Sequence, residues 1–223
     1  LDADVGGLGG QGLGRRGRGR GDLGDRIDVG VVGGFGEGLD DPQATVRFDL
    51  TPAGLHAQIL SPNGTVYIDP AFQGEDQFHT SYFKRAYVRS PDGFQCLLEE
   101  DAAGRGTAAL TGGSSGGAIA LARSGASLRT YRLAVAATGE YTAYHGGTVT
   151  AGMAAIVTAV NRVTGVYETE LAIRLVLVAN NELLVYTNGN TDPFANGTPS
   201  SLLTQNQSTI DSIIGSANYD IGH

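Results

Sequence analysis

The stretch from Thr130 to Ala179 decides the fold; it begins TYRLAVAATGEY and ends IRLVLVA. Residues 130–137 alternate so that the apolar side chains of Tyr131, Leu133, Val135 and Ala137 fall on one face, which is typical of a β-strand. Residues 173–179 form a short apolar run typical of a buried strand. Between them, Thr148 is suited to cap a helix whose apolar residues recur at helical spacing. Strand, helix and strand in this order predict a right-handed crossover with a parallel strand pair, and 130–137 is expected to be central. The predicted apolar helix face comprises Met153, Ile156, Val157, Val160, Val163 and Tyr167.

Less regular elements follow up to the last residue. Residues 183–186 are a short apolar run, for which we expect a strand. Thr198 and Pro199 suit the N-cap and first position of a second helix, and Gly215 suits its end. Residues 218–223 begin another extended segment. The second helix is expected to bury one face, formed by Leu202, Leu203, Ile210, Ile213 and Ile214.

Composition excludes several classes of protein. A length of 223 residues allows one large domain or two small ones. The net charge of −8 argues against a nucleic-acid partner for the chain as a whole. Cys96 is the only cysteine, so there is no internal disulfide framework, although an oxidising compartment remains open. No apolar run reaches the roughly 18 residues that span a bilayer, and we expect no membrane partner.

Residues 1–38 form a low-complexity segment rich in glycine and arginine. Residues 14–21 resemble an Arg-Gly patch that contacts single-stranded nucleic acid, but no aromatic residue is interleaved and acidic residues follow. The two readings we favour are a disordered tail and a translation artefact from a GC-rich gene read in a wrong frame. Re-reading the coding DNA in the other frames separates these readings.

The sequence predicts a β-rich unit over residues 39–102. Over residues 103–127 it predicts a flexible linker that is open to proteolysis. Three short strands are expected within 45–70, with a tight turn at Ser61-Pro62-Asn63-Gly64 between the second and the third. The first strand would carry Val46, Phe48 and Leu50 on one face. This apolar face must pack against further β-structure. Residues 77–88 are rich in aromatic side chains and suit a strand or a docking surface.

Three segments resemble the opening half of a reprolysin-type zinc metallopeptidase domain, a metzincin, and are most similar to secreted bacterial members. They are Tyr131–Tyr141, Ile173–Asn181 and Gly215–His223. The resemblance covers residues 128–223 and implies an α/β architecture, α+β overall, for the N-terminal half of a metzincin-like domain. A weaker resemblance over 39–87 implies that the β-meander, at 46–70 above all, is the remnant of a propeptide.

The resemblance implies zinc as the cofactor of the full-length parent and protein or peptide substrates. The family binds zinc through H-E-x-x-H-x-x-G-x-x-H, in which two histidines one turn apart share a helix face and the glutamate acts as general base. The sequence contains no such motif: its histidines are His56, His79, His145 and His223. We therefore expect a truncated, catalytically inert fragment that binds no cofactor, with no catalytic or metal-ligating residue of its own.

Cys96 is the candidate metal ligand with a possible regulatory role. A propeptide cysteine can cap the catalytic zinc of a zymogen, because a thiolate is a good zinc ligand that displaces the reactive water. The sequence around it, Phe94-Gln95-Cys96-Leu97-Leu98, lacks the Cys-Gly pair of better-known reprolysin propeptides. A buried structural cysteine is the favoured alternative.

Other polar residues have plainer interpretations. Glu140 and Asp192, with the polar loop 188–192, offer oxygen ligands for calcium, but their spacing does not match an EF-hand. His145 suits a loop contact, and His223 a structural role in an extended segment.

Two functions follow. The first is a fragment of a secreted, extracellular zinc endopeptidase precursor, and the alternative is a secreted non-catalytic binding or adhesion module with a β-rich and an α/β part. A third, weaker option is RNA binding through the Arg-Gly segment. We expect residues 128–223 to fold poorly alone, which a cooperative unfolding transition of that piece would contradict.

Overall fold

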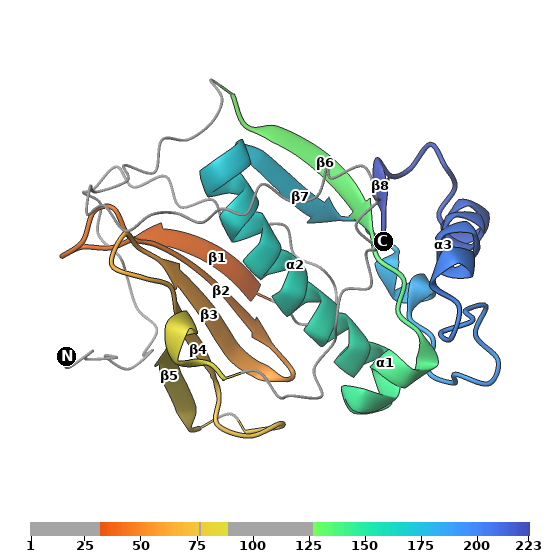
Figure 1. Ribbon diagram of the computed structural model, residues 1–223, viewed down its shortest axis with the longest axis horizontal. Helices are drawn as coiled ribbons and strands as arrows, with labels where there is room; N and C mark the ends of the chain where they lie inside the picture. Colours follow the sequence, from red (N-terminus) through yellow and green to blue (C-terminus); the bar gives the residue numbers. More distant parts are fainter. Residues whose placement is uncertain (1–31, 76, 89–126) are drawn as a thin grey trace, which may run out of the picture.

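The protein is described from a computed structural model, which places residues 32–75, 77–88 and 127–223. Figure 1 shows helix α2 (Val149–Leu171) lying between two sheets, with helix α3 (Pro199–Ile213) at the far side of the second sheet. We call the five-stranded antiparallel sheet the meander sheet and the three-stranded parallel sheet the parallel sheet. Strands and helices together confirm the mixed α/β fold. Cys96 and most of the predicted linker lie outside the described residues.

The meander sheet contains the three strands predicted within residues 45–70. Its Ser61–Gly64 turn is also as predicted, because the Gly64 N–H donates to the Ser61 carbonyl at 2.9 Å and Gly64 has a φ of 123°. The aromatic segment 77–88 supplies a strand. The sheet consists, in spatial order, of β1 (Val32–Glu37), β2 (Thr45–Thr51), β3 (Gly54–Leu60), β4 (Val66–Pro70) and β5 (His79–Phe83), and a short 3-10 helix η1 (Lys84–Ala86) follows.

Strand β1 extends the sheet into the glycine-rich segment, which the sequence pattern did not predict. It pairs with β2 over six residues, from Val32 opposite Leu50 to Glu37 opposite Thr45. A Cβ added at Gly34 would lie 2.7 Å from Cζ of Phe48, so glycine is what allows the aromatic ring to lie against this strand.

The parallel sheet confirms the predicted crossover. Strand β6 (Arg129–Ala134) is central, with β7 (Ile173–Leu177) on one side and β8 (Ile221–Gly222) on the other, and both pairs are parallel. Thr148 caps α2 as predicted, because its hydroxyl accepts a hydrogen bond from the Ala151 N–H at 3.1 Å. The helix ends at Ala172, whose left-handed φ of 54° turns the chain into β7.

Three local predictions need correction. A short helix α1 (Gly139–Tyr144) forms directly after β6, capped by Thr138, where the sequence pattern predicted no helix. Residues 181–184 form the 3-10 helix η2 (Asn181–Leu184) instead of starting a strand, and only Val185 makes a single bridge, to Ala137. Pro199 begins α3 as predicted, but Thr198 makes no side-chain cap.

Two hydrophobic clusters cover opposite faces of the parallel sheet, because successive residues of β6 and its extension point to opposite sides. Leu133 and Val135 pack toward α2, against Met153 and Ile156. On the other face, Ala134 packs with Leu184 and Ile210 in the second cluster, at α3. The sheet is therefore a layer between two helices, as Figure 1 shows.

Four apolar residues predicted to be buried are exposed. In α2, Val163 and Tyr167 are 42% and 38% exposed, and neither belongs to the apolar cluster around Met153 and Ile156. In α3, Leu203 and Ile213 are 79% and 38% exposed, because only the strip around Ile210 contacts the sheet. Helix α2 is long and apolar enough to cross a membrane by length and composition, but its contacts with both sheets are those of a core helix.

Candidate functional site

The histidines of the described residues do not assemble a metal centre. Residues 32–75, 77–88 and 127–223 hold no group of three or more His, Cys, Asp or Glu side chains arranged to bind an ion. His145 packs against the rings of Tyr141 and Tyr144, with centroids 4.5 and 5.0 Å away, and burial lowers its pKa. His223 extends the β8 pairing through its backbone, donating to the Ala134 carbonyl at 2.9 Å. His56 contacts Asp49 at the meander sheet, where its Nδ1 lies 3.5 Å from the carboxylate.

The polar loop proposed for calcium lies beside the end of β6. A small cavity of about 270 Å³ opens there, between the start of α1 and residues 187–190. The two candidate carboxylates accept hydrogen bonds from amide groups: Asp192 from the Gly139 backbone at 2.7 Å, and Glu140 from the Asn196 side chain at 2.7 Å. Gly189 leaves room for the Glu140 carboxylate, because an added Cβ would lie 2.4 Å from one of its oxygens. These bonds fasten the loop to α1.

Asn181 fastens the end of β7 to β6. Its side chain is 1% exposed, accepts from the Val135 N–H at 2.7 Å and donates to the Val135 carbonyl at 3.0 Å. The amide thus takes the place that a neighbouring strand would occupy. Both backbone groups are satisfied where regular pairing stops, which a buried backbone requires. The sequence pattern assigned no role to this asparagine, and its one signal was a polar residue directly after a buried strand.

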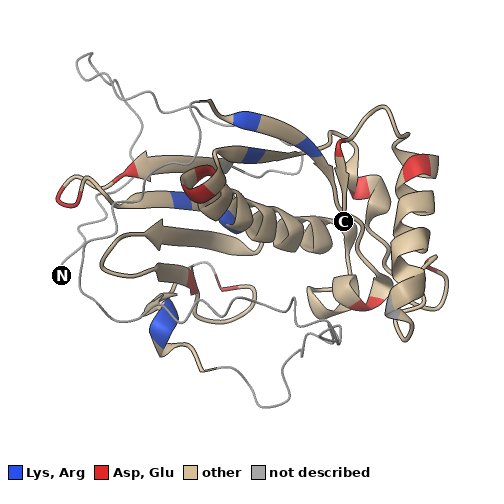
Figure 2. Cartoon of the chain, turned by 45° about the horizontal axis from the view of Figure 1, so that its top comes forward, with Lys and Arg blue, Asp and Glu red and all other residues tan. Residues whose placement is uncertain are grey.

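A charged clamp holds the segment after α3 against β6. Both carboxylate oxygens of Asp220 accept from the Arg132 guanidinium, at 2.8 and 3.2 Å, and one also accepts from the Arg132 N–H at 2.7 Å. These bonds from Arg132 lower the pKa of Asp220 to about 2. The guanidinium also donates to the Ala217 carbonyl at 2.8 Å, so one side chain fixes the whole approach to β8. Figure 2 shows further acidic positions along α1 and α3 at this end of the sheet.

The edge where β6 and β7 end is therefore a firmly held scaffold. In sheets of parallel strands this edge is where ligands bind. Among the described residues it carries amides, carboxylates and backbone groups, each engaged in holding a loop or strand. The residues that the structure describes at this edge do not bring together a nucleophile, a base and an electrophilic group, which chemistry there would need.

Comparisons with known proteins agree with this architecture. Residues 127–223 match the family model described as metallo-peptidase family M12B, reprolysin-like. Searches of curated proteins and of solved structures found no significant match. The matched residues contain α1, α2, α3, the whole parallel sheet, the Asn181 contact and the Arg132–Asp220 clamp. The match covers less than half of the chain, and it shows that residues 127–223 are similar to the reprolysin-like M12B metallopeptidases.

Proposed function

We propose that the chain is part of the precursor of a secreted, extracellular zinc endopeptidase. Residues 127–223 would form the part of the peptidase domain that precedes the zinc-binding helix, and residues 39–102 the end of the propeptide. The observation that carries the proposal is the coincidence of the family match with one closed unit of structure, in which β8 adds to β6 beyond the β6–α2–β7 crossover. Protein or peptide substrates follow from the family.

Zinc in this class of enzyme activates the water that attacks the peptide bond. The described residues do not fit a zinc site, and the sequence has no H-E-x-x-H motif. In the proposal, zinc ligands and base come from outside these 223 residues, and this chain alone is inactive. Its own residues position the scaffold: Asn181 joins the ends of β6 and β7, and Arg132 holds the segment that runs into β8.

A pair of expression products tests the proposal. One is the 223-residue chain, and the other is the chain with the coding sequence that continues after His223. We expect the longer product to bind zinc and to cleave a fluorogenic peptide in a way that a chelator abolishes, whereas the shorter product does neither. A continuation without a histidine pair flanking a glutamate, or a longer product that binds no zinc, would overturn the proposal.

The second candidate is a secreted non-catalytic binding module, and one observation favours it. The apolar side chains of the meander sheet, among them Phe48 and Leu50, lie on the face that α2 does not contact, and Leu50 is 51% exposed. Such a face suits packing on another β-rich piece. Zinc-dependent cleavage by the longer product separates the two candidates, because a binding module would show none.

A further inference from the structure

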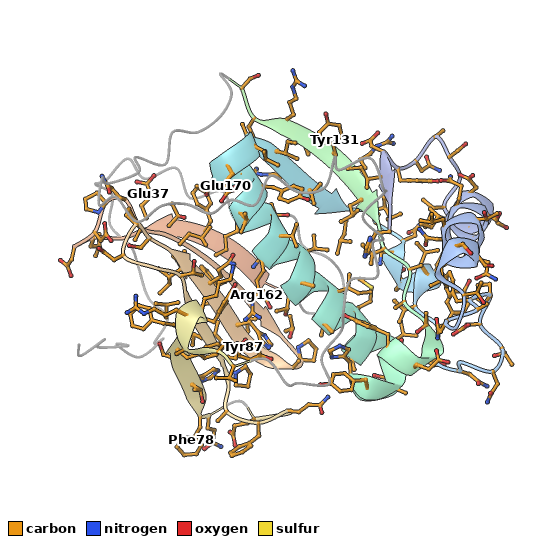
Figure 3. All side chains as sticks on the ribbon, viewed as in Figure 1. Glu37, Phe78, Tyr87, Tyr131, Arg162 and Glu170 are labelled. Carbon is orange, nitrogen blue, oxygen red and sulfur yellow. The ribbon has the colours of Figure 1, made fainter. Side chains whose placement is uncertain are left out.

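Helix α2 has a second buried face, and it is polar. Five residues at positions i, i+3, i+4, i+7 and i+10 face the meander sheet, and we call them the polar strip: Thr158, Asn161, Arg162, Gly165 and Glu168. At 3.6 residues per turn this strip lies roughly 120° around the helix from the apolar face on the parallel sheet. Figure 3 shows Arg162 on the side of α2 that faces the meander sheet.

The meander sheet presents matching groups along the strip. Asp49, which is 1% exposed, accepts from the Thr158 hydroxyl at 2.6 Å and from the Asn161 amide at 3.1 Å. One turn further along α2, Arg162 pairs with Asp69 of β4 and lies 4.9 Å from the ring centroid of Tyr67.

At the end of the strip the signs are reversed. Glu168 of α2 pairs with Arg47 of β2, and Arg174 of β7 contacts the same carboxylate. Along the helix, the strip thus presents hydrogen-bond donors, then the cation Arg162, then the anion Glu168. The sheet opposes them with Asp49, Asp69 and Arg47, respectively. Only one register of sheet on helix satisfies this order.

The sheet is turned with its polar face inward. Strand alternation places Arg47 and Asp49 on the face toward α2, and Val46, Phe48 and Leu50 on the opposite face. Across the described residues, both hydrophobic clusters consist of residues 127–223 only. The contact between the meander sheet and α2 is therefore not a shared hydrophobic core.

Two polar atoms of this contact are left without partners. The Gln58 side-chain oxygen and the Arg162 Nε are buried and make no hydrogen bond. Cores rarely tolerate such atoms, whereas interfaces between domains within a chain are more polar and resemble transient protein–protein interfaces.

We propose that the polar strip of α2 is a docking surface, and that the meander sheet, residues 32–88, is a separable partner held on it by charge complementarity. The strip fits a β-sheet face that carries two carboxylates and an arginine in the order of Asp49, Asp69 and Arg47. The proposal requires neither zinc nor peptidase activity, so it stands or falls independently of the proposed function.

The experiment uses the full chain with a recognition sequence for a specific protease in place of residues 111–117. After cleavage, gel filtration measures whether the two pieces remain together. We expect them to co-elute at an ionic strength of about 0.05 M and to separate at about 1 M, where screening is strong. Co-elution of the wild-type pieces at about 1 M salt would overturn the proposal.

A charge swap tests the register. Arg162→Asp should raise the Kd of the cleaved pieces about 30-fold or more, because it leaves Asp69 facing a like charge. Adding Asp69→Arg should recover most of that loss. Val163→Lys, on the exposed side of the same helix, is the matched control and should leave the Kd unchanged. If Arg162→Asp abolishes folding of the uncleaved chain, or if the swap recovers nothing, the contact is part of one core and the proposal fails.

Discussion

Helix α2 contacts two sheets, and the two contacts are built on different chemistry. Toward the parallel sheet it buries Met153 and Ile156 in an apolar cluster, whereas toward the meander sheet it buries hydrogen-bonded and charged groups. Burial of apolar side chains is favourable without a specific partner, but buried polar groups are favourable only while their partners remain. The first contact should therefore determine whether residues 127–223 fold, and the second whether the meander sheet stays bound.

The largest effect should come from removing a buried polar side chain on the apolar side. Asn181→Leu would leave the buried N–H and carbonyl of Val135 without partners. At 1–3 kcal/mol for each orphaned group, we expect a loss of about 4 kcal/mol in the free energy of unfolding. Urea unfolding of the full chain measures it, and Asn180→Ala, at an exposed neighbour, is the control. A loss as small as that of the control would mean that the Asn181 contact contributes little.

A cavity on the apolar side should rank next. Met153 is 1% exposed, and Met153→Ala is expected to cost about 3 kcal/mol, in the range of buried large-to-small substitutions. Val163→Ala removes an apolar side chain from the same helix, but its side chain is 42% exposed, and we expect less than about 1 kcal/mol. Comparable losses from both variants would contradict the assignment of the core to one side of α2.

Alanine substitution of a glycine should change the stability of residues 127–223 in opposite directions on the two sides of α2. A Cβ at Gly165 would lie 3.0 Å from both Arg47 Cδ and Gln58 Oε1, across the polar contact. Gly165→Ala should stabilise α2 by up to about 1 kcal/mol, because glycine is a poor helix former, and should weaken docking of the meander sheet in the cleaved chain. Gly152→Ala should only destabilise, since its Cβ would lie 2.8 Å from Val185 on the apolar side. If urea unfolding showed that both substitutions change the free energy of unfolding in the same direction, the distinction between the two contacts would be wrong.

These residues show what the sequence could predict. Strand alternation at 130–137 and helical spacing from Met153 gave the crossover and its core, because the burial of one face leaves a periodic trace. The strip of α2 that includes Thr158 and Arg162 was missed, since a polar face normally indicates solvent. The partners of Arg162 and Asn181 lie 93 and 46 residues away, and no local pattern specifies such pairings.

Alkaline pH should destabilise the meander sheet. Burial and the hydrogen bond that Tyr82 donates to Asp69 raise the pKa of Tyr82 to about 12, from its usual value of 10.0; Arg162 and Tyr67 are its other charged or titratable neighbours. Because the folded pKa is raised, its contribution to stability is complete below pH 10 and is lost as the pH rises through about 12. Urea unfolding of the full chain across this range should show this loss of stability, and Tyr82→Phe should reduce it. An unaltered pH profile in that variant would assign the effect to other groups.

The smallest effect should come from the exposed clamp between Arg132 and Asp220, which belongs to neither contact of α2. Its geometry is good, but solvent and salt screen exposed pairs. Since Arg132 depresses the pKa of Asp220 to about 2, the contribution is present above about pH 3.8 and is lost as the pH falls through about 2. Asp211 also titrates below its usual value, because Gln207 and Tyr219 donate to it. In urea unfolding, Asp220→Asn should therefore reduce only part of the loss of stability at acid pH, and Asp211→Asn should reduce another part. A loss of stability at neutral pH from Asp220→Asn as large as that from Met153→Ala would show that the edge at β8, and not the apolar side of α2, limits folding.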